Sequence, residues 1–403
     1  MRIQQAILGL CFATVVNAQH EIIGGIINAV DIDSMLLYVE QMSGEVAVDL
    51  GNGPVTITSR HSDHADNALA QLYYEQKFAA LGYSTVAQAF NATGRNILVT
   101  KTGEVYPDEI VILCAHYDAM PPGMFTAPAA DDDGSGCAAV LEAARILRDI
   151  PFERTIVFAL WDQEEQGKIG SIYYANSMAG NDENIVGVVN MDAIAYDGNA
   201  DRKARVHARQ VANSMAIADT VFAVLDRYDI DIDLLLTTPG ATYSDHASFW
   251  SAGYGAVLMI EEFSGDGNPY YHTVNDRVQH FDVPYFEKMA KLSIGSAAAL
   301  AVPFDPTASI RTSTVAAPWQ LDVYPNPSEG VSRVWINVEL PGRYRVSLVN
   351  AVGQELQTIT QADLGAGKFG FDLDLTSVRP GAYRLVATGP SGRTTTTSVV
   401  RMP

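Results

Sequence analysis

The 403-residue sequence has few cysteines, few basic residues and no long apolar run after its first residues. Three cysteines are too few for a disulfide-stapled small protein, and a hydrophobic share of 48% excludes intrinsic disorder. Lys and Arg number 26 against 47 Asp and Glu, so the formal net charge is −21. This charge disfavours nucleic acid and anionic membranes as partners. No later segment approaches the roughly 18 apolar residues of a membrane span, so we expect none.

The first 18 residues have the pattern of a secretory signal peptide. Arg2 is followed by an apolar stretch over residues 7–16 and by the small residue Ala18 at the expected cleavage site. This pattern predicts that residues 1–18 are removed and that the mature chain is secreted. Two cysteines then remain, Cys114 and Cys137, either as buried free thiols or as a disulfide.

Charge and composition divide the mature chain into two domains. Residues 19–318 carry 17 basic and 40 acidic residues, whereas residues 319–403 carry 8 basic and 7 acidic residues. Between them, residues 303–318 are rich in Pro, Ser, Thr and Ala, which predicts a linker. We therefore expect a large domain over 19–302 and a small one over 319–403. Residues 19 to about 60 are either a removable pro-segment or the first elements of the large domain.

The large domain shows strand and helix patterns in alternation. Four short apolar runs have the β-branched content of buried strands: Ile110–Ala115, Thr155–Leu160, Ile185–Met191 and Ala256–Ile260. Helical periodicity covers Asn67–Leu81 and the stretch from Cys137 to Leu147. The alternation predicts an α/β fold with a mostly parallel central sheet flanked by helices. After residue 319, short alternating runs separated by Gly or Pro predict a small all-β sandwich domain.

Acidic residues and histidines follow the predicted strands, at the end where open α/β sheets bind ligands. They are His116, Asp118, Asp131, Asp132, Asp133, Glu164, Glu165, Asp192 and His272. Carboxylates and imidazoles bind zinc-like cations, and a pair of cations about 3.5–4 Å apart needs one bridging carboxylate. Of the adjacent Glu164 and Glu165, whose side chains diverge, one is expected to be a ligand and the other a general base. No Gly-x-Ser-x-Gly motif is present, which weighs against a serine hydrolase.

Asp118 stands two residues after His116, at the end of the first predicted strand. In extended chain, side chains two residues apart point to the same side. We therefore expect the Asp118 carboxylate to accept a hydrogen bond from the His116 imidazole and to orient it.

Several short motifs together resemble those of the co-catalytic dizinc aminopeptidase family over about residues 33–302. They are His116-Tyr117-Asp118, Ala130-Asp131-Asp132-Asp133-Gly134-Ser135-Gly136, Asp162-Gln163-Glu164-Glu165-Gln166-Gly167, Asn190-Met191-Asp192, Tyr243-Ser244-Asp245-His246 and Tyr271-His272-Thr273. The resemblance implies the zinc exopeptidase fold and two Zn²⁺ ions. It also implies that Asp132 bridges the ions, that His116 and Asp192 hold one, and that Glu165 and His272 hold the other.

The resemblance further assigns catalytic roles. Glu164 is implied to be the general base, and Tyr271 to polarise the scissile carbonyl, as a tyrosine does in some members. The peptide bond from Asp132 to Asp133 is expected to be cis. Some relatives place an arginine where this chain has Tyr243, so that mode of substrate contact is not carried over. His207, Asp245, His246 and His280 we expect to be structural.

The small domain resembles the C-terminal sorting domain of the type IX secretion system. The motifs are Leu321-Asp322-Val323-Tyr324-Pro325-Asn326-Pro327, Asn350-Ala351-Val352-Gly353-Gln354 and Pro380-Gly381-Ala382-Tyr383-Arg384-Leu385. The resemblance implies a Gram-negative host, passage through the periplasm and export by the type IX machinery to the cell surface or medium. The alternative for this domain is a carbohydrate-binding or adhesion module.

Together these observations predict a secreted metallo-aminopeptidase that acts on peptides with a free N-terminus. Two alternatives remain open. One is a glutaminyl cyclase or carboxypeptidase on the same scaffold, and the other is a non-catalytic binding protein. The ligand set favours zinc, although cobalt or manganese fit the same spacing.

Overall fold

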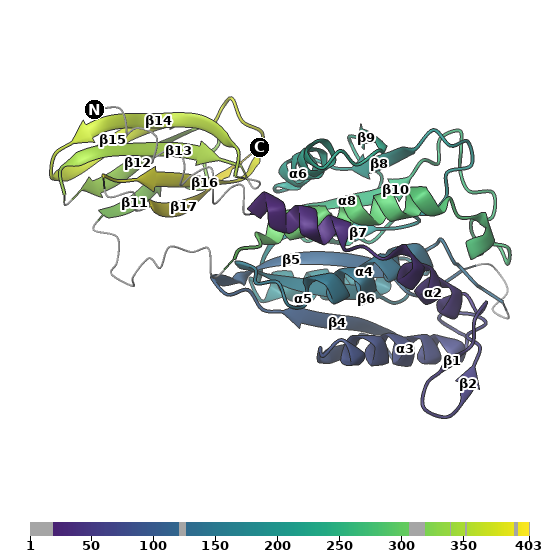
Figure 1. Ribbon diagram of the computed structural model, residues 1–403. Coiled ribbons are helices and arrows are strands. Elements are labelled where there is room, and N and C mark those ends of the chain that lie inside the picture. The colour runs from purple at the N-terminus through teal and green to yellow at the C-terminus, as the bar shows by residue number, and fades with distance from the viewer. Residues whose placement is uncertain are drawn as a thin grey trace. The chain divides into compact units, whose positions relative to one another are not determined.

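The computed structural model of the chain describes residues 19–120, 126–305, 319–338, 340–350, 353–390 and 394–402 (Figure 1). The predicted signal peptide and most of the predicted linker lie outside these residues, and the predicted domain boundaries stay predictions. Contacts divide the chain into two compact units, one of Ile23–Ala301 and one that contains Val302 and the residues after it.

An eight-stranded sheet forms the centre of the first unit, in the order β3-β4-β6-β5-β7-β10-β8-β9. The strands are β3 (Thr85–Ala89), β4 (Arg95–Lys101), β5 (Tyr106–His116), β6 (Arg154–Trp161), β7 (Asn184–Met191), β8 (Lys203–His207), β9 (Asp233–Thr237) and β10 (Ala256–Glu261). The four predicted apolar runs form β5, β6, β7 and β10, which are adjacent and parallel. Strands β3, β4 and β8 pair antiparallel with their inner neighbours, so the sheet is mixed outside its parallel centre.

Helices flank this sheet (Figure 1). They are α2 (Ile32–Met42), α3 (Asp66–Ala80), α4 (Gly134–Leu147), α5 (Ile169–Gly180), α6 (Ser214–Arg227), α7 (His246–Ser251) and α8 (Val283–Ala301), with a short 3-10 helix η1 (Val278–His280). The two predicted helical stretches are α3 and α4. Cys114 of β5 and Trp161 of β6 pack with Tyr174 of α5 and Phe249 of α7 in one core layer. Helices α4 and α8 contact the sheet and each other. The predicted α/β architecture is confirmed.

The N-terminal residues of this unit are integral to its core. The helix Gln19–Asn28 buries Ile23, Ile26 and Ile27, and the side chain of Ile27 lies against Gly295 of α8. Among the described residues, no single helix has the length and hydropathy to cross a membrane. In the same part of the chain, one pair of helices, Gln19–Asn28 and Ile32–Met42, meets that test together, with a bend of 53° between them.

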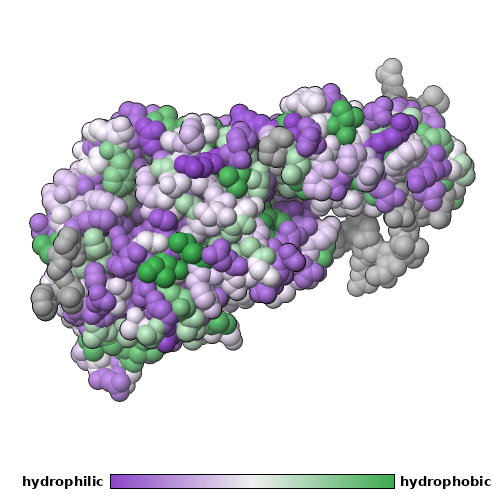
Figure 2. All heavy atoms as spheres, turned by 180° about the vertical axis from the view of Figure 1, so that it is seen from behind, coloured by the Kyte–Doolittle hydropathy of each residue, from purple (hydrophilic) through white to green (hydrophobic). Residues whose placement is uncertain are grey.

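The second unit consists of two antiparallel sheets. Its strands are β11 (Trp319–Tyr324), β12 (Val331–Val338), β13 (Gly342–Val349), β14 (Glu355–Leu364), β15 (Gly367–Asp374), β16 (Gly381–Thr388) and β17 (Thr394–Arg401). One sheet has the order β11-β12-β15 and the other β14-β13-β16-β17. Val334 and Ile336 from the first sheet and Val346 and Leu348 from the second are fully buried in one core. The predicted β-sandwich is confirmed. The face drawn in Figure 2 is mostly hydrophilic, with apolar side chains singly and in small groups, as is usual when the large apolar residues are buried.

Candidate metal centre

The predicted ligand residues meet at the carboxyl ends of the parallel strands. His116 is the last residue of β5, Asp192 directly follows β7, and Glu165 lies in the loop after β6. Asp132 precedes α4, and His272 lies in the segment after β10. Because parallel strands end at the same edge of a sheet, segments far apart in the sequence deliver these five side chains to one place.

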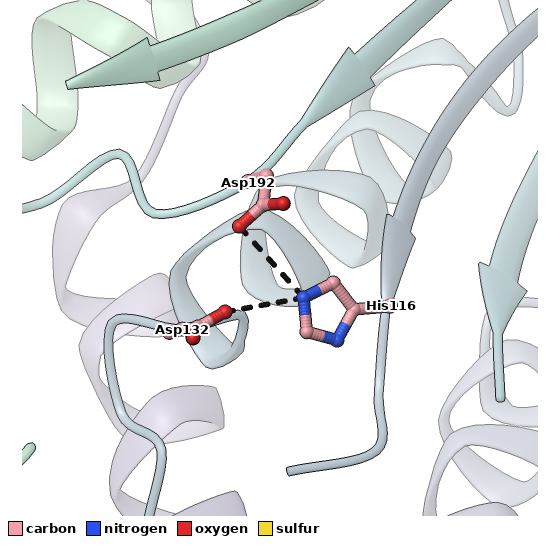
Figure 3. Close-up of side chains that lie close together, drawn as sticks. All are labelled: His116, Asp132 and Asp192. Atoms are coloured by element: carbon pink, nitrogen blue, oxygen red, sulfur yellow. Dashed lines mark ion pairs between the residues drawn. The ribbon is translucent and has the colours of Figure 1, made fainter. Parts of the chain in front are cut away.

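Asp132 lies between two groups of possible metal ligands, one of which is drawn in Figure 3. Its Oδ1 atom is 3.1 Å from Nε2 of His116, and that nitrogen is 3.7 Å from Oδ1 of Asp192. Its Oδ2 atom is 3.0 Å from Nε2 of His272, and that nitrogen is 3.1 Å from Oε2 of Glu165. The two oxygens of one carboxylate therefore face two separate imidazoles, which is the geometry that a bridging ligand requires.

Three buried atoms of these groups have no hydrogen-bond partner within the described part of the chain: Asp132 Oδ2, Glu165 Oε1 and His272 Nε2. His272 Nε2 and Asp132 Oδ2 are 3.0 Å apart but do not form a hydrogen bond. Buried polar atoms without a partner are rare in folded proteins, and carboxylate oxygens and imidazole nitrogens are the donors that zinc takes. The side chains therefore fit a pair of divalent cations.

The charges of this cluster shift the pKa values of its members. Burial lowers the pKa of His272, but the carboxylates of Asp132 and Glu165 outweigh burial and raise that pKa to about 10. Burial raises the pKa of Asp132, but the imidazoles of His116 and His272 outweigh burial and lower that pKa below its usual value. Burial and the neighbouring Asp132 raise the pKa of Glu165 to about 7. The cluster of carboxylates thus favours a positive charge between them, and a divalent cation would supply that charge.

Glu164 is buried beside these ligand groups and belongs to neither of them. Burial raises its pKa well above the usual value, and the carboxylates of Asp245 and Asp192 raise that pKa further, while His116 lowers it. The adjacent glutamates are therefore distinguished by their places: Glu165 lies in a ligand group, and Glu164 lies next to it. A buried carboxylate with a raised pKa has the properties of a general base.

Asp118 contacts the outer side of the His116 ring. Nδ1 of His116 hydrogen-bonds to the backbone carbonyl oxygen of Asp118 at 3.3 Å, and the carboxylate Oδ1 of Asp118 is 3.5 Å from the same nitrogen. Nε2 of the ring faces Asp132. Asp118 also accepts hydrogen bonds from the backbone N–H groups of Glu164 and Glu165. The carboxylate thus has the contacts of a residue that orients a ligand, and it belongs to neither ligand group.

Two further acids, Asp276 and Asp133, support the backbone near Asp132. Sequence patterns did not identify Asp276 and gave Asp133 no role. Asp276 accepts hydrogen bonds from the backbone N–H groups of Asp131 and Asp132 at 3.0 and 3.1 Å. Asp133 accepts from the backbone N–H of His116 at 3.1 Å and caps α4 through Gly136. The Asp132–Asp133 peptide bond is cis, as the resemblance implied. A weak signal for Asp276 was its position four residues after His272.

Asp245 and His246, which we expected to be structural, are fully buried. His246 packs edge-on against Trp250, and its Nε2 atom is 2.8 Å from the carbonyl oxygen of Ala241. Neither carboxylate oxygen of Asp245 has a hydrogen-bond partner among the residues that the structure describes. Burial raises the pKa of Asp245 to about 7. These contacts suit a structural role for His246, whereas at Asp245 burial outweighs the charge of His116, which favours the ionised carboxylate.

Exposed aromatic residues lie next to the ligand groups. The ring of Tyr271 stacks on the imidazole of His272, with centroids 3.8 Å apart, and its edge contacts Phe263. Tyr243 is half exposed, and its hydroxyl is 3.4 Å from Nε2 of His207. Tyr271 is therefore adjacent to a ligand side chain, where a substrate reaching the centre would meet it.

Both cysteines of the large unit are free and buried. The thiol of Cys114 lies 3.2 Å from Oδ1 of Asn190, and that of Cys137 donates to the carbonyl oxygen of His116 at 3.0 Å. The disulfide alternative is therefore wrong, and both residues act as small core side chains.

Comparisons with known proteins agree with this architecture. Residues 96–297 match Peptidase family M28, and residues 322–401 match the Secretion system C-terminal sorting domain. The first match covers half of the chain, so the chain belongs to peptidase family M28. The resemblances that the sequence motifs indicated are confirmed.

Among similar proteins, leucine aminopeptidase 1 of Trichophyton equinum is 30% identical over 232 residues, which are 55% of this chain and 61% of that protein. The chain spans 58% and 52% of the length of the related leucine aminopeptidases of Paracoccidioides brasiliensis and Uncinocarpus reesii. LapA aminopeptidase of Legionella pneumophila, at 21% identity, shares the fold with a TM-score of 0.61 over 71% of this chain and 76% of that chain. Glutaminyl cyclase of Fimbriiglobus ruber, at 19% identity, shares it with a TM-score of 0.53 over 66% of this chain and 95% of that chain.

Proposed function

We propose that this protein is a secreted, zinc-dependent aminopeptidase with two metal ions. The observation that carries the proposal is the position of Asp132, whose two carboxylate oxygens face His116 and His272 separately. Asp192 completes one ligand group and Glu165 the other. When bound, zinc ions supply Lewis-acid chemistry, polarising the scissile carbonyl and acidifying the attacking water.

Glu164 moves the proton in this proposal. Its raised pKa lets its carboxylate accept a proton from the attacking water and then donate that proton to the amine of the leaving peptide. Asp118 fixes the backbone at Glu164 and orients His116, so that base and ligand keep their spacing.

Tyr271 is the proposed donor to the scissile carbonyl. Its ring is positioned by the stack on His272, so the hydroxyl can be removed without losing the ring contact. Tyr271→Phe is expected to lower kcat about 10-fold with little change in KM, because one hydrogen bond made in the transition state is lost. Equal kcat values in the variant and the wild type would remove Tyr271 from the mechanism.

The test of the activity uses a panel of aminoacyl-p-nitroanilides and the same compounds with a blocked amine. Hydrolysis of the free-amine compounds only, lost on chelation and restored by zinc, is the expected result. Hydrolysis of blocked compounds would identify an endopeptidase or carboxypeptidase. A zinc-loaded protein that hydrolyses none of them, but cyclises N-terminal glutamine, would be a glutaminyl cyclase.

The sorting domain supports the proposed localisation. We expect the type IX machinery to recognise residues 322–401 after the chain has crossed the periplasm. Deleting residues 319–403 in the native host should retain the peptidase unit inside the cell envelope, as fractionation and immunoblotting would show. Release of the truncated chain into the medium would contradict this route.

A further inference from the structure

Arg60 is a fully buried arginine that donates to four backbone carbonyl oxygens. Nε donates to Tyr117 at 2.8 Å, and Nη1 donates to Met42 and Pro128 at 2.8 and 2.7 Å. Nη2 donates to Ala129 at 2.8 Å. Burying a guanidinium costs free energy unless each of its N–H groups has an acceptor. When acceptors are present, the planar group fixes the positions of the atoms that it contacts. Arg60 therefore holds several backbone segments at one point.

Two of these carbonyls belong to segments that carry the candidate ligands. Tyr117 stands between His116 and Asp118, so its carbonyl lies in the stretch that ends β5. Ala129 stands three residues before Asp132, on the approach to α4. One guanidinium thus ties together two of the three backbone segments that present the group of His116, Asp132 and Asp192.

The backbone at Ala129 needs such support. Its φ angle is +43°, in the left-handed region that residues with a Cβ seldom adopt. A residue keeps this conformation only where its surroundings fix it. The carbonyl of Ala129 accepts from Arg60 and also from the N–H of Gly134 at 3.2 Å. Two donors therefore hold the carbonyl oxygen of a strained residue.

The same N-terminal segment also reaches the loop beyond His272. The Oε1 atom of Glu45 accepts a hydrogen bond from the backbone N–H of Val278 at 3.0 Å. Met42, just before it, is one of the carbonyl acceptors of Arg60. Residues 42–60 consequently contact the backbone at Tyr117, at Ala129 and at Val278, next to three different candidate ligands.

We infer that Arg60 is a positioning residue of the metal centre, which holds His116 and Asp132 at the spacing that a metal pair requires. It acts through the carbonyls of Tyr117 and Ala129 and touches no substrate. The inference rests on the proposed function. The residues up to Arg60 would then be needed in the active protein, which argues against a removable pro-segment.

The test compares Arg60→Lys and Arg60→Met with Arg145→Met as a matched control. Arg145 also links the N-terminal segment to the body of the unit, through Ala29 and Glu142, but it contacts neither ligand-bearing segment. The zinc dissociation constant is measured on the full chain by competition with a chelator of known affinity. Circular dichroism checks that each variant is folded.

We expect zinc affinity to fall about 10- to 100-fold in Arg60→Lys, as for other residues that support metal ligands, and further in Arg60→Met. Arg145→Met should bind zinc as the wild type does. Arg60→Lys keeps a cation and three donors, so it provides the test even if Arg60→Met does not fold. At saturating zinc, Arg60→Lys should recover most of its kcat, because the variant still contains every ligand and the base.

Two results would overturn the inference while leaving the proposed function intact. One is wild-type zinc affinity in folded Arg60→Lys. The other is an equal loss of zinc affinity in Arg145→Met, which would indicate that any loosening of the N-terminal segment weakens the site. A wild-type chain that binds no zinc would refute the proposed metal centre itself, and this inference with it.

Discussion

The backbone N–H of Glu164 donates a 2.9 Å hydrogen bond to Oδ1 of the Asp118 carboxylate. The N–H of Glu165 donates to the other oxygen at 3.2 Å. The same carboxylate lies 3.5 Å from Nδ1 of His116. One buried acid thus couples the end of β5 to the loop after β6, and with it the position of a candidate ligand to that of the candidate base.

This coupling predicts that Asp118→Asn impairs both the metal centre and the base. An amide has one acceptor oxygen, so it cannot accept both backbone N–H groups and also face the imidazole. We expect zinc affinity to fall about 10-fold and kcat about 10- to 100-fold, as measured by chelator competition and by hydrolysis at saturating zinc. Asp149→Asn, at an exposed position, is the control and should change neither quantity.

The adjacent glutamates should respond differently to the same substitution. Glu164→Gln is expected to lower kcat by about 10²- to 10⁴-fold and to keep both metals, because it removes a base and no ligand. Glu165→Gln should lose zinc from the group that contains His272, as metal analysis of the purified variants would show. Loss of zinc from Glu164→Gln, or full retention in Glu165→Gln, would reverse the two assignments.

Asp245 and Asp276 are buried acids for which opposite effects on stability are expected. Neither oxygen of Asp245 has a partner in the described part of the chain, so Asp245→Asn should raise the free energy of unfolding by about 1–3 kcal/mol. Both oxygens of Asp276 accept backbone N–H groups, so Asp276→Asn should lower it by a similar amount. Urea unfolding of the two variants measures both effects. A destabilised Asp245→Asn would indicate that this carboxylate has a stabilising partner.

His207 should make the large unit sensitive to acid. Burial, assisted by the charge of Arg205, lowers its pKa from 6.5 to about 4, and Nδ1 accepts the backbone N–H of Ala241. Between these pH values the unfolded chain binds more protons than the folded one, so stability falls as the pH falls through this window. The expected loss is on the order of 2 kcal/mol for this residue.

The measurement for His207 is urea unfolding in steps from pH 7 to pH 4. His207→Gln should flatten the dependence of stability on pH, because the titrating ring is gone. Tyr243→Phe removes the hydroxyl beside Nε2 but keeps the imidazole, so it should retain the wild-type slope. An unchanged slope in His207→Gln would assign the acid sensitivity to other groups.

Sequence patterns predicted the parts of the fold whose local signal is strong. The apolar runs of β5, β6, β7 and β10 are buried on both faces, so nearly every residue in them is apolar. The outer strands β3, β4, β8 and β9 were not predicted, because none of them has more than three consecutive apolar residues. The ligand candidates were predictable because they lie in the segments that follow clearly predicted strands. Arg60 and Asp276 lie away from the strand ends, and their roles depend on backbone groups that no sequence pattern identifies.

The sequence by itself determined which groups are available: carboxylates and imidazoles at the ends of parallel strands, and a separate β domain of the sorting type. The carboxyl ends of neighbouring parallel strands lie at one edge of the sheet, so groups that follow these strands come together there whatever the loop conformations. Only the tertiary structure decided that the two oxygens of Asp132 face different imidazoles. Spacing along the chain did not distinguish Glu164 from Glu165, and the structure places Glu165 in a group of possible metal ligands, as the resemblance implied. It also decided that Arg60 contacts the backbone next to His116 and before Asp132. These outcomes depend on side-chain directions and hydrogen bonds between residues far apart in the chain, which spacing along the sequence does not determine.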